Sequence, residues 1–186
     1  MSSAVDLSLG EWAVLGLLVA SPAHGFALAK ELAVEGTWGR IWTVRRPLVY
    51  RALNTLETSG LIGVERAEES RLGPRRAVYR ATGAGRAAFA KWLSEPVAHY
   101  RDARSQLLLK LGFLWRRNES ADALLKAQLA VIEPMLEGLR EKLAGSEGFD
   151  HTLALWRYES ARALVRFVET LRAEGGKPHG RTPSGG

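Results

Sequence analysis

The sequence contains no cysteine, and its histidines are few and far apart. Without thiols the chain can form no disulfide, no thiolate metal site and no cysteine nucleophile. None of the histidines has metal-ligand spacing to another; they are His24, His99, His151 and His179. The sequence therefore predicts no metal site and no cofactor.

Long hydrophobic runs are also missing. The longest apolar run, from Trp12 to Ala20, has nine residues, whereas a membrane-spanning helix needs about 20. No basic segment precedes this run, so we expect no signal peptide. The chain has 46% hydrophobic and 25% charged residues, which is typical of globular proteins. We therefore expect a soluble, cytoplasmic protein.

Sequence motifs of catalysis are absent as well. The chain has no G-x-S-x-G, no P-loop, no G-x-G-x-x-G after a strand and no histidines clustered with carboxylates. Because these patterns carry the common nucleophilic, phosphoryl-transfer and dinucleotide chemistries, we expect that the protein is not an enzyme.

The positive charge of the chain is concentrated in one segment. The net charge is +6, and the segment from Arg40 to Arg86 holds ten arginines against four glutamates, so it carries the whole excess. A basic segment on an otherwise neutral chain is typical of proteins that bind a polyanion. An arginine-rich face in water, or one that binds an acidic protein partner, has the same charge pattern.

The first 97 residues carry signals for helices and for one hairpin. Ser8 and Glu11 have the spacing of a capping box, Thr43 is a possible N-cap of the third helix, and Gly60 suits the position after its end. Helices are expected at about 9–20, 25–34, 44–59 and 83–95, and a β-hairpin at 61–69 and 76–82 with a turn at 70–75. Three helices, a hairpin and a further helix follow the order of a winged helix–turn–helix domain.

In such a domain the third helix enters the major groove of DNA and the hairpin lies along the backbone. One apolar stripe on this helix, formed by Val49, Leu53 and Leu56, leaves its other faces to arginine and asparagine, which suit guanine and adenine edges. The residues expected to bind DNA are Thr43, Arg45, Arg46, Arg51 and Asn54 near or on the helix, and Arg71, Arg75 and Arg76 at the hairpin tip.

The second half of the sequence reads as helical, with helices at about 103–117, 119–144 and 150–174. Its apolar stripes contain more surface than these helices bury against one another, so we expect a dimer. The expected interface residues are Leu125, Leu129, Ile132, Leu136, Leu139, Leu153, Trp156, Leu164, Phe167 and Leu171.

The expected fold class is mostly α (α+β). A winged helix–turn–helix domain covers residues 1–97, an all-α antiparallel dimerisation domain covers 98–174, and 175–186 form a flexible tail.

Three segments resemble motifs of the PadR family of transcriptional regulators. The segment 9–32 ends its apolar helix in a polar break followed by His24-Gly25-Phe26, and RRPLVYRALNTLETSGLI (45–62) resembles the family's recognition helix. In RAVYRATGAGRAAFAKWL (76–93), the Tyr-x-x-Thr-x-x-Gly spacing is similar to that of the family's return strand and next helix. The matching residues of the last two segments are Tyr50, Leu53, Leu56, Glu57, Gly60, Leu61, Ile62, Tyr79, Thr82 and Gly85.

The resemblance implies a homodimeric repressor that binds double-stranded DNA at a pseudo-palindromic operator and responds to a small ligand or environmental cue. It places Tyr50 at the boundary between the helix and the phosphates, which adds this residue to the DNA-binding set. The chain departs from many relatives at Pro47-Leu48, where Leu48 suits a thymine methyl or shields Tyr50. Trp12 and Trp92 are expected in the core, and Trp115 in the core or the dimer interface. Trp92 and Trp115 are also the expected lining of a pocket for an aromatic or apolar effector.

Overall fold

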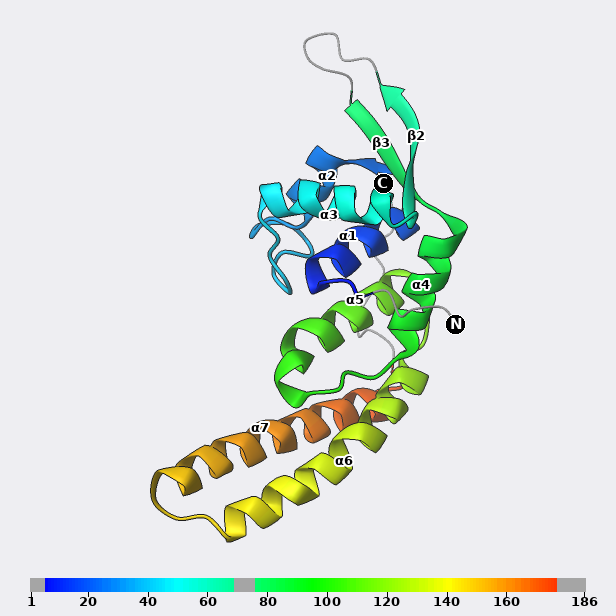
Figure 1. Ribbon diagram of the computed structural model, residues 1–186. Helices are drawn as coiled ribbons and strands as arrows, with labels where there is room; N and C mark the ends of the chain where they lie inside the picture. The colour runs from blue at the N-terminus through cyan, green and yellow to red at the C-terminus, as the bar shows by residue number, and fades with distance from the viewer. Residues whose placement is uncertain (1–5, 69–75, 177–186) are drawn as a thin grey trace. The chain divides into compact units, whose positions relative to one another are not determined.

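The computed structural model describes residues 6–68 and 76–176 of the chain. The chain divides into two compact units, with the division after Trp92. The N-terminal unit holds α1, β1, α2, α3, β2, β3 and most of α4, and the C-terminal unit is helical (Figure 1). The predicted fold class, mostly helical with a small antiparallel sheet in a winged-helix arrangement, is confirmed.

Helix α1 spans Leu9–Ala20, as predicted. The predicted capping box is present, because the Ser8 backbone N–H donates to Glu11 Oε2 over 2.7 Å and the Glu11 N–H donates to Ser8 Oγ over 3.4 Å. All residues from Trp12 to Leu18 are buried. A helix that is apolar on every side is stable only when surrounded, so α1 forms the centre of the N-terminal unit.

A two-residue strand, β1 (Ala23–His24), precedes α2 (Gly25–Glu31). The His24 side chain caps α2, since its Nδ1 accepts a hydrogen bond from the Ala27 N–H over 3.0 Å. This geometry confirms the interpretation of His24 as a helix-start residue. Helix α2 is shorter than the predicted 25–34, because the chain turns back after it and the Trp38 N–H donates to the Glu31 carbonyl over 3.1 Å.

Helix α3 spans Arg46–Thr58, and its N-cap is Arg45. The expectation that Thr43 caps this helix is wrong, since its hydroxyl donates to the Gly39 carbonyl over 2.8 Å. The helix begins later because Pro47 lacks an N–H and is compatible only with the first turn. It ends at Thr58, and Gly60, which has φ +70°, follows the C-cap Ser59 as predicted.

Strands β2 (Ile62–Glu68) and β3 (Arg76–Ala81) form the predicted hairpin, which projects from the helices of its unit (Figure 1). The sheet is antiparallel, and its order is β1-β3-β2. The pairing skips one residue between Val64–Tyr79 and Arg66–Val78, so Glu65 is the extra residue of a β-bulge. A bulge redirects the side chain of the extra residue.

The Thr-x-x-Gly part of the return-strand motif joins the end of α3 to α4 (Gly83–Ser94). The Thr82 hydroxyl donates to the Gly60 carbonyl over 2.8 Å and accepts from the Gly85 N–H over 3.0 Å. A Cβ atom on Gly85 would lie 2.0 Å from the Leu61 carbonyl oxygen, so the close approach requires glycine. This motif therefore has a structural role in connecting α3 to the rest of its unit.

Aromatic stacking completes the N-terminal core. The Trp12 and Trp92 rings stack with centroids 5.0 Å apart, and Phe89 lies 5.6 Å from Trp92. All three side chains are buried. The prediction that Trp12 and Trp92 are core residues is confirmed.

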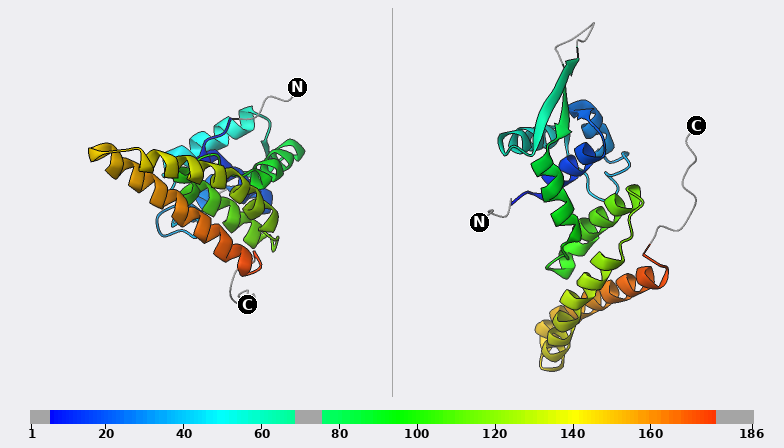
Figure 2. Two further views of the ribbon diagram at one scale, coloured as in Figure 1. Left: turned by 90° about the horizontal axis from the view of Figure 1, so that it is seen from below. Right: turned by 90° about the vertical axis from the view of Figure 1, so that its right-hand side faces the viewer.

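The C-terminal unit begins with a 3₁₀ turn, η1 (Tyr100–Asp102), and a π-helical segment, η2 (Ala103–Leu107), which lead into α5 (Leu108–Arg116). The predicted continuous α-helix from residue 103 is thus wrong over its first five residues. Helices α6 (Asp122–Ala144) and α7 (Gly148–Ala173) run side by side in all views (Figures 1 and 2).

Among the described residues of the C-terminal unit, the buried polar side chains are Lys110 and Gln128. The Gln128 amide makes two hydrogen bonds with Val97, donating to its carbonyl over 2.9 Å and accepting from its N–H over 2.7 Å. The Lys110 ammonium donates to the Glu95 carbonyl. If the segment that follows α4 moved away, Lys110 and Gln128 would be left buried without hydrogen-bond partners, which is strongly unfavourable. Both side chains therefore hold this segment in place.

Burial lowers the pKa of Lys110 from 10.5 to about 8, although Glu95 opposes this shift. Between pH 8 and 10 the unfolded chain keeps the lysine proton and the folded chain loses it. The free energy of unfolding should therefore rise with pH in this range, by up to ~1.4 kcal/mol per unit. Denaturant unfolding at pH 8 and 9.5 should show this rise for the wild type and a smaller one for Lys110→Met. Equal pH dependence in both proteins would contradict the assignment.

Candidate nucleic-acid interface

Helix α3 has a buried face and an exposed face. The buried face consists of Val49, Ala52, Leu53 and Leu56, at the three- and four-residue spacing of one helix side. The DNA-binding residues predicted near or on this helix all lie outside the buried face and are exposed; they are Thr43, Arg45, Arg46, Tyr50, Arg51 and Asn54. Burying one face in the core thus leaves the other free to contact a ligand.

The N-terminal end of α3 is electropositive. Arg45 and Arg46 stand at its first positions, its first turn contains no acidic residue, and no side chain caps it. The positive end of the helix dipole adds to these charges. Within residues 6–68 and 76–176, no ion pair neutralises Arg45 or Arg51. The end of this helix is therefore suited to an anion.

Two aromatic rings lie close to the Arg46 guanidinium. Its Cζ atom lies 5.6 Å from the ring centroid of Phe26 on α2 and 5.8 Å from that of Tyr50, one turn further along α3. Both distances are in the range of cation–π interactions. Phe26 was not predicted to take part in the site, because it is distant from α3 in the sequence.

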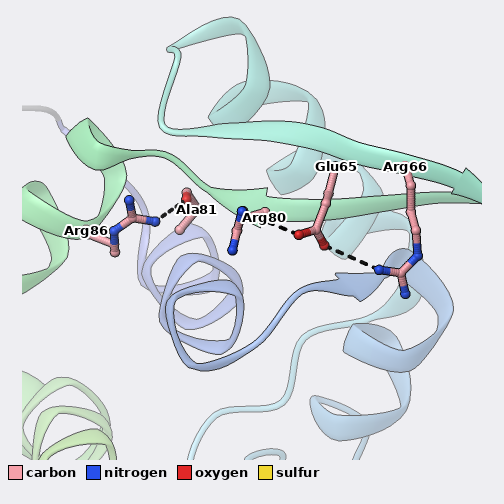
Figure 3. A network of polar contacts seen from close by, with 5 residues as sticks. All are labelled: Glu65, Arg66, Arg80, Ala81 and Arg86. Atoms are coloured by element: carbon pink, nitrogen blue, oxygen red, sulfur yellow. Dashed lines mark hydrogen bonds and ion pairs between the residues drawn. The ribbon is translucent and has the colours of Figure 1, made fainter.

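The hairpin contributes a second basic surface (Figure 3). The bulged Glu65 carboxylate lies 3.4 Å from the Arg80 guanidinium on the neighbouring strand and 3.6 Å from that of Arg66. Both arginine side chains remain about 60% exposed. Two arginines outnumber this carboxylate, and exposed ion pairs of this kind contribute little to stability. Both arginine side chains thus lie on the hairpin surface, where they can contact a polyanion.

The hairpin arginines predicted from the sequence are different residues from Arg66 and Arg80. Arg71 and Arg75 fall outside the described residues, and Arg76 is the first residue of β3, with a side chain outside the description. Sequence reasoning missed Arg66 and Arg80 as site residues. The alternation of Arg80 with Tyr79 along β3 was a usable signal, but the bulge at Glu65, which precedes Arg66 in β2, was not visible in the sequence.

Tyr79 lies where the hairpin approaches α3. Burial raises the pKa of its hydroxyl, and the nearby Glu57 and Tyr50 raise it further. The phenol is therefore neutral at physiological pH. A neutral hydroxyl adds no negative charge to this basic side of the unit.

The predicted dimer-interface residues separate into three groups by their burial. Several are buried within the single chain, namely Leu125, Leu129, Ile132 and Leu164, while Leu136, Leu139 and Leu171 are half-buried. The exposed members are Leu153, Trp156 and Phe167, and Phe149 and Leu155 on the same helix are also exposed. The apolar surface left uncovered thus belongs to α7 rather than to α6.

The two tryptophans proposed for an effector pocket lie in different units. Trp92 is packed in the N-terminal core. Trp115, near the end of α5, is half-buried, and its Nε1 is buried without a hydrogen-bond partner in the part of the chain that is described.

No three His, Asp or Glu side chains among residues 6–68 and 76–176 come together in a way that suits a metal ion. In the same part of the chain, no helix has the length and apolar character required to cross a membrane.

Comparison with known proteins agrees with the motifs. Residues 14–91 match the transcriptional regulator PadR-like family. This match confirms the resemblance predicted from the sequence, and the family is one of transcription regulators, not of enzymes. A sequence comparison with curated proteins gives no significant match.

Several solved structures are similar to the chain at low identity. Bacillus subtilis PadR in complex with operator DNA is 22% identical over 90% of this chain and 99% of that chain, with a TM-score of 0.47. A PadR-like transcription factor from Bacteroides fragilis is 26% identical over 44% and 73%, with a TM-score of 0.38. The PadR-like regulator BC1756 from Bacillus cereus is 19% identical over 93% and 99%, with a TM-score of 0.38.

Proposed function

We propose that this chain, whose residues 14–91 match the PadR-like regulators, is a homodimeric, sequence-specific DNA-binding repressor. Helix α3 enters the major groove, and the β2–β3 hairpin lies along the phosphates. The observation that carries the proposal is the exposed face of α3, where arginines and Asn54 stand opposite a fully buried apolar face.

The side chains on this face suit base recognition. Arginine makes two hydrogen bonds to the edge of guanine, and asparagine makes two to adenine. Arg51 and Asn54 are three residues apart, so they are neighbours on the helix surface. Leu48 is 49% exposed, which suits contact with a thymine methyl. The face therefore carries both polar and apolar groups for reading a sequence.

Homodimerisation is proposed from α7. Phe149, Trp156 and Phe167 are separated by seven and eleven residues, close to two and three helical turns, so they form one stripe. Their exposed fractions are 79%, 71% and 37%. A stripe of large aromatic side chains is unusual on a water-exposed surface, and a second copy of α7 would cover it. A two-fold dimer reads half-sites about one helical turn apart, or a multiple of that distance.

A small aromatic or apolar effector is part of the same proposal. The unpaired Trp115 Nε1 offers a donor to a ligand that enters the C-terminal unit. Quenching of tryptophan fluorescence in wild type, compared with Trp115→Phe, is the measurement that tests this role.

The central experiment is an anisotropy titration of the full chain with labelled duplexes. One duplex is selected by the chain from a randomised library, and the other has random sequence. DNA binding predicts tighter association with the selected duplex. If neither duplex binds, the basic surface serves an acidic protein partner instead, and the proposed function is wrong.

The hairpin is expected to determine the salt dependence of binding. Each phosphate contact contributes about 0.9 to the slope of log K against log salt. The double variant Arg66→Ala, Arg80→Ala should therefore bind both duplexes more weakly, by a similar factor for the selected and the random duplex. Its slope of log K against log salt should be smaller by about 0.9 to 1.8 per hairpin. As the opposite control, Glu65→Gln should strengthen binding to both duplexes. Unchanged slopes in both variants would show that Arg66 and Arg80 do not touch phosphate.

A further inference from the structure

Phe26 is an unusual residue at its position. It is a large apolar side chain in the first turn of α2, yet 51% of it is exposed. Tyr50 on α3 is 45% exposed, and the Arg46 guanidinium lies within 6 Å of both ring centroids. The exposed ring of Phe26 therefore forms part of the surface around Arg46, rather than part of the core.

The position of Phe26 is determined by the two residues before it, His24 and Gly25. His24 pairs with Val78 in the sheet and caps α2 through Nδ1. Gly25 approaches Tyr50 so closely that a Cβ atom would lie 2.8 Å from the tyrosine ring. The first turn of α2 is thus seated directly against Tyr50. The backbone that carries Phe26 is therefore placed beside the Tyr50 ring.

We infer that Phe26 is a positioning residue that orients Arg46 for contact with a guanine edge in the major groove. This inference rests on the proposed function. A guanidinium interacts with an aromatic ring through its flat face, so its N–H groups stay free at the edge for two parallel hydrogen bonds. A free arginine side chain loses considerable rotamer entropy when it binds, and prior orientation reduces that loss.

The location of Arg46 favours a base edge over a phosphate. It is the first residue of α3, and in helix–turn–helix proteins the N-terminal residues of the recognition helix contact the bases. Arg45, one position earlier, has no ring beside it in the described structure. The two neighbouring arginines therefore differ in their surroundings, because aromatic rings lie beside the Arg46 guanidinium and not beside that of Arg45 in the described structure.

The test compares Phe26→Leu with Phe26→Tyr, because leucine keeps the apolar volume and removes the aromatic face, whereas tyrosine keeps the ring. An exposed cation–π contact corresponds to about a two- to fivefold change in binding constant. With two half-sites, Phe26→Leu should weaken binding to the selected duplex by about 4- to 25-fold and leave random-duplex binding unchanged. Phe26→Tyr should bind as the wild type does.

A double-variant comparison separates positioning from a structural role. In the Arg46→Ala background, Phe26→Leu should cause no further loss, because the residue that it orients is gone. An equal loss in both backgrounds would overturn the inference. Thermal unfolding of each variant checks the fold, and Val34→Ala, a substitution of another exposed apolar residue of the unit, serves as the surface control.

Other outcomes distinguish this inference from the proposed function. If Phe26→Leu binds as the wild type while Arg51→Ala loses the selected duplex, the inference fails and the proposed function stands. If Phe26→Leu weakens both duplexes equally, Arg46 contacts phosphate and the assignment to a base edge is wrong. If the wild type selects no duplex, both the proposed function and the inference fail.

Discussion

The double variant Trp156→Asp, Phe167→Asp is expected to be a folded monomer that binds the selected duplex about 100-fold or more weakly than the wild type. Each substitution places a charge in the exposed aromatic stripe of α7, where a partner helix would have to bury it. Loss of the dimer removes the gain from linking two half-site contacts, which reaches about 10²–10⁴-fold. Sedimentation equilibrium measures the mass, and anisotropy measures the affinity.

The choice of residues makes this test specific. Leu164 is buried within its own chain at 8% exposure, so Leu164→Asp would unfold the unit whether or not a dimer exists. Arg166→Asp is a suitable control, because this exposed residue lies on α7 but off the aromatic stripe, and it should leave the mass unchanged. A wild-type monomer at micromolar concentration, or a dimeric double variant, would contradict the proposed interface.

Replacing Arg51 or Asn54 with alanine is expected to weaken binding to the selected duplex much more than binding to random DNA. Each lost pair of hydrogen bonds to a base edge corresponds to about 1–3 kcal/mol, and a two-fold dimer loses it at both half-sites. Folding should be unaffected, because both side chains are exposed and exposed substitutions seldom change stability by more than ~0.5 kcal/mol. Titration with both duplexes at one salt concentration measures the difference.

Arg104→Ala provides the charge control for Arg51→Ala. Arg104 is an exposed residue of η2 in the C-terminal unit, so its loss lowers the net charge equally without altering α3. It should affect both duplexes only slightly. If Arg51→Ala and Asn54→Ala weaken selected and random duplexes to the same extent, α3 contacts the DNA backbone and the bases are read by another part of the chain.

Local sequence signals determined much of the N-terminal unit. Ser8 and Glu11 specify the start of α1 through hydrogen bonds three residues apart. Gly60 specifies the end of α3, since its φ of +70° suits glycine. The three-residue spacing of Arg51 and Asn54 places both on the face opposite the buried stripe. Each of these features depends on residues within one or two turns of one another, so it can be predicted from the sequence.

Features that depend on distant residues were decided by the tertiary structure. Strand β1 has only two residues and exists because it pairs with β3, more than 50 positions away. The bulge at Glu65 follows from the register of β2 against β3, and it places one carboxylate between Arg66 and Arg80. No periodicity along the chain reports such pairings, because hydrogen bonds between strands leave no local pattern.

The division of apolar residues between core and surface was also a matter of tertiary packing. The sequence shows apolar stripes on the helices of residues 122–144 and 148–173, but it does not show which side each helix turns toward its neighbour. In the folded chain Ile132 is buried and Trp156 is 71% exposed. Phe26 likewise reaches Arg46 only because α2 is seated against α3. The sequence by itself determined which residue types lie on each helix. Only the packing of one helix on another decided which of these residues remain exposed to a partner. The reason is that burial depends on contacts between segments that are far apart in the chain.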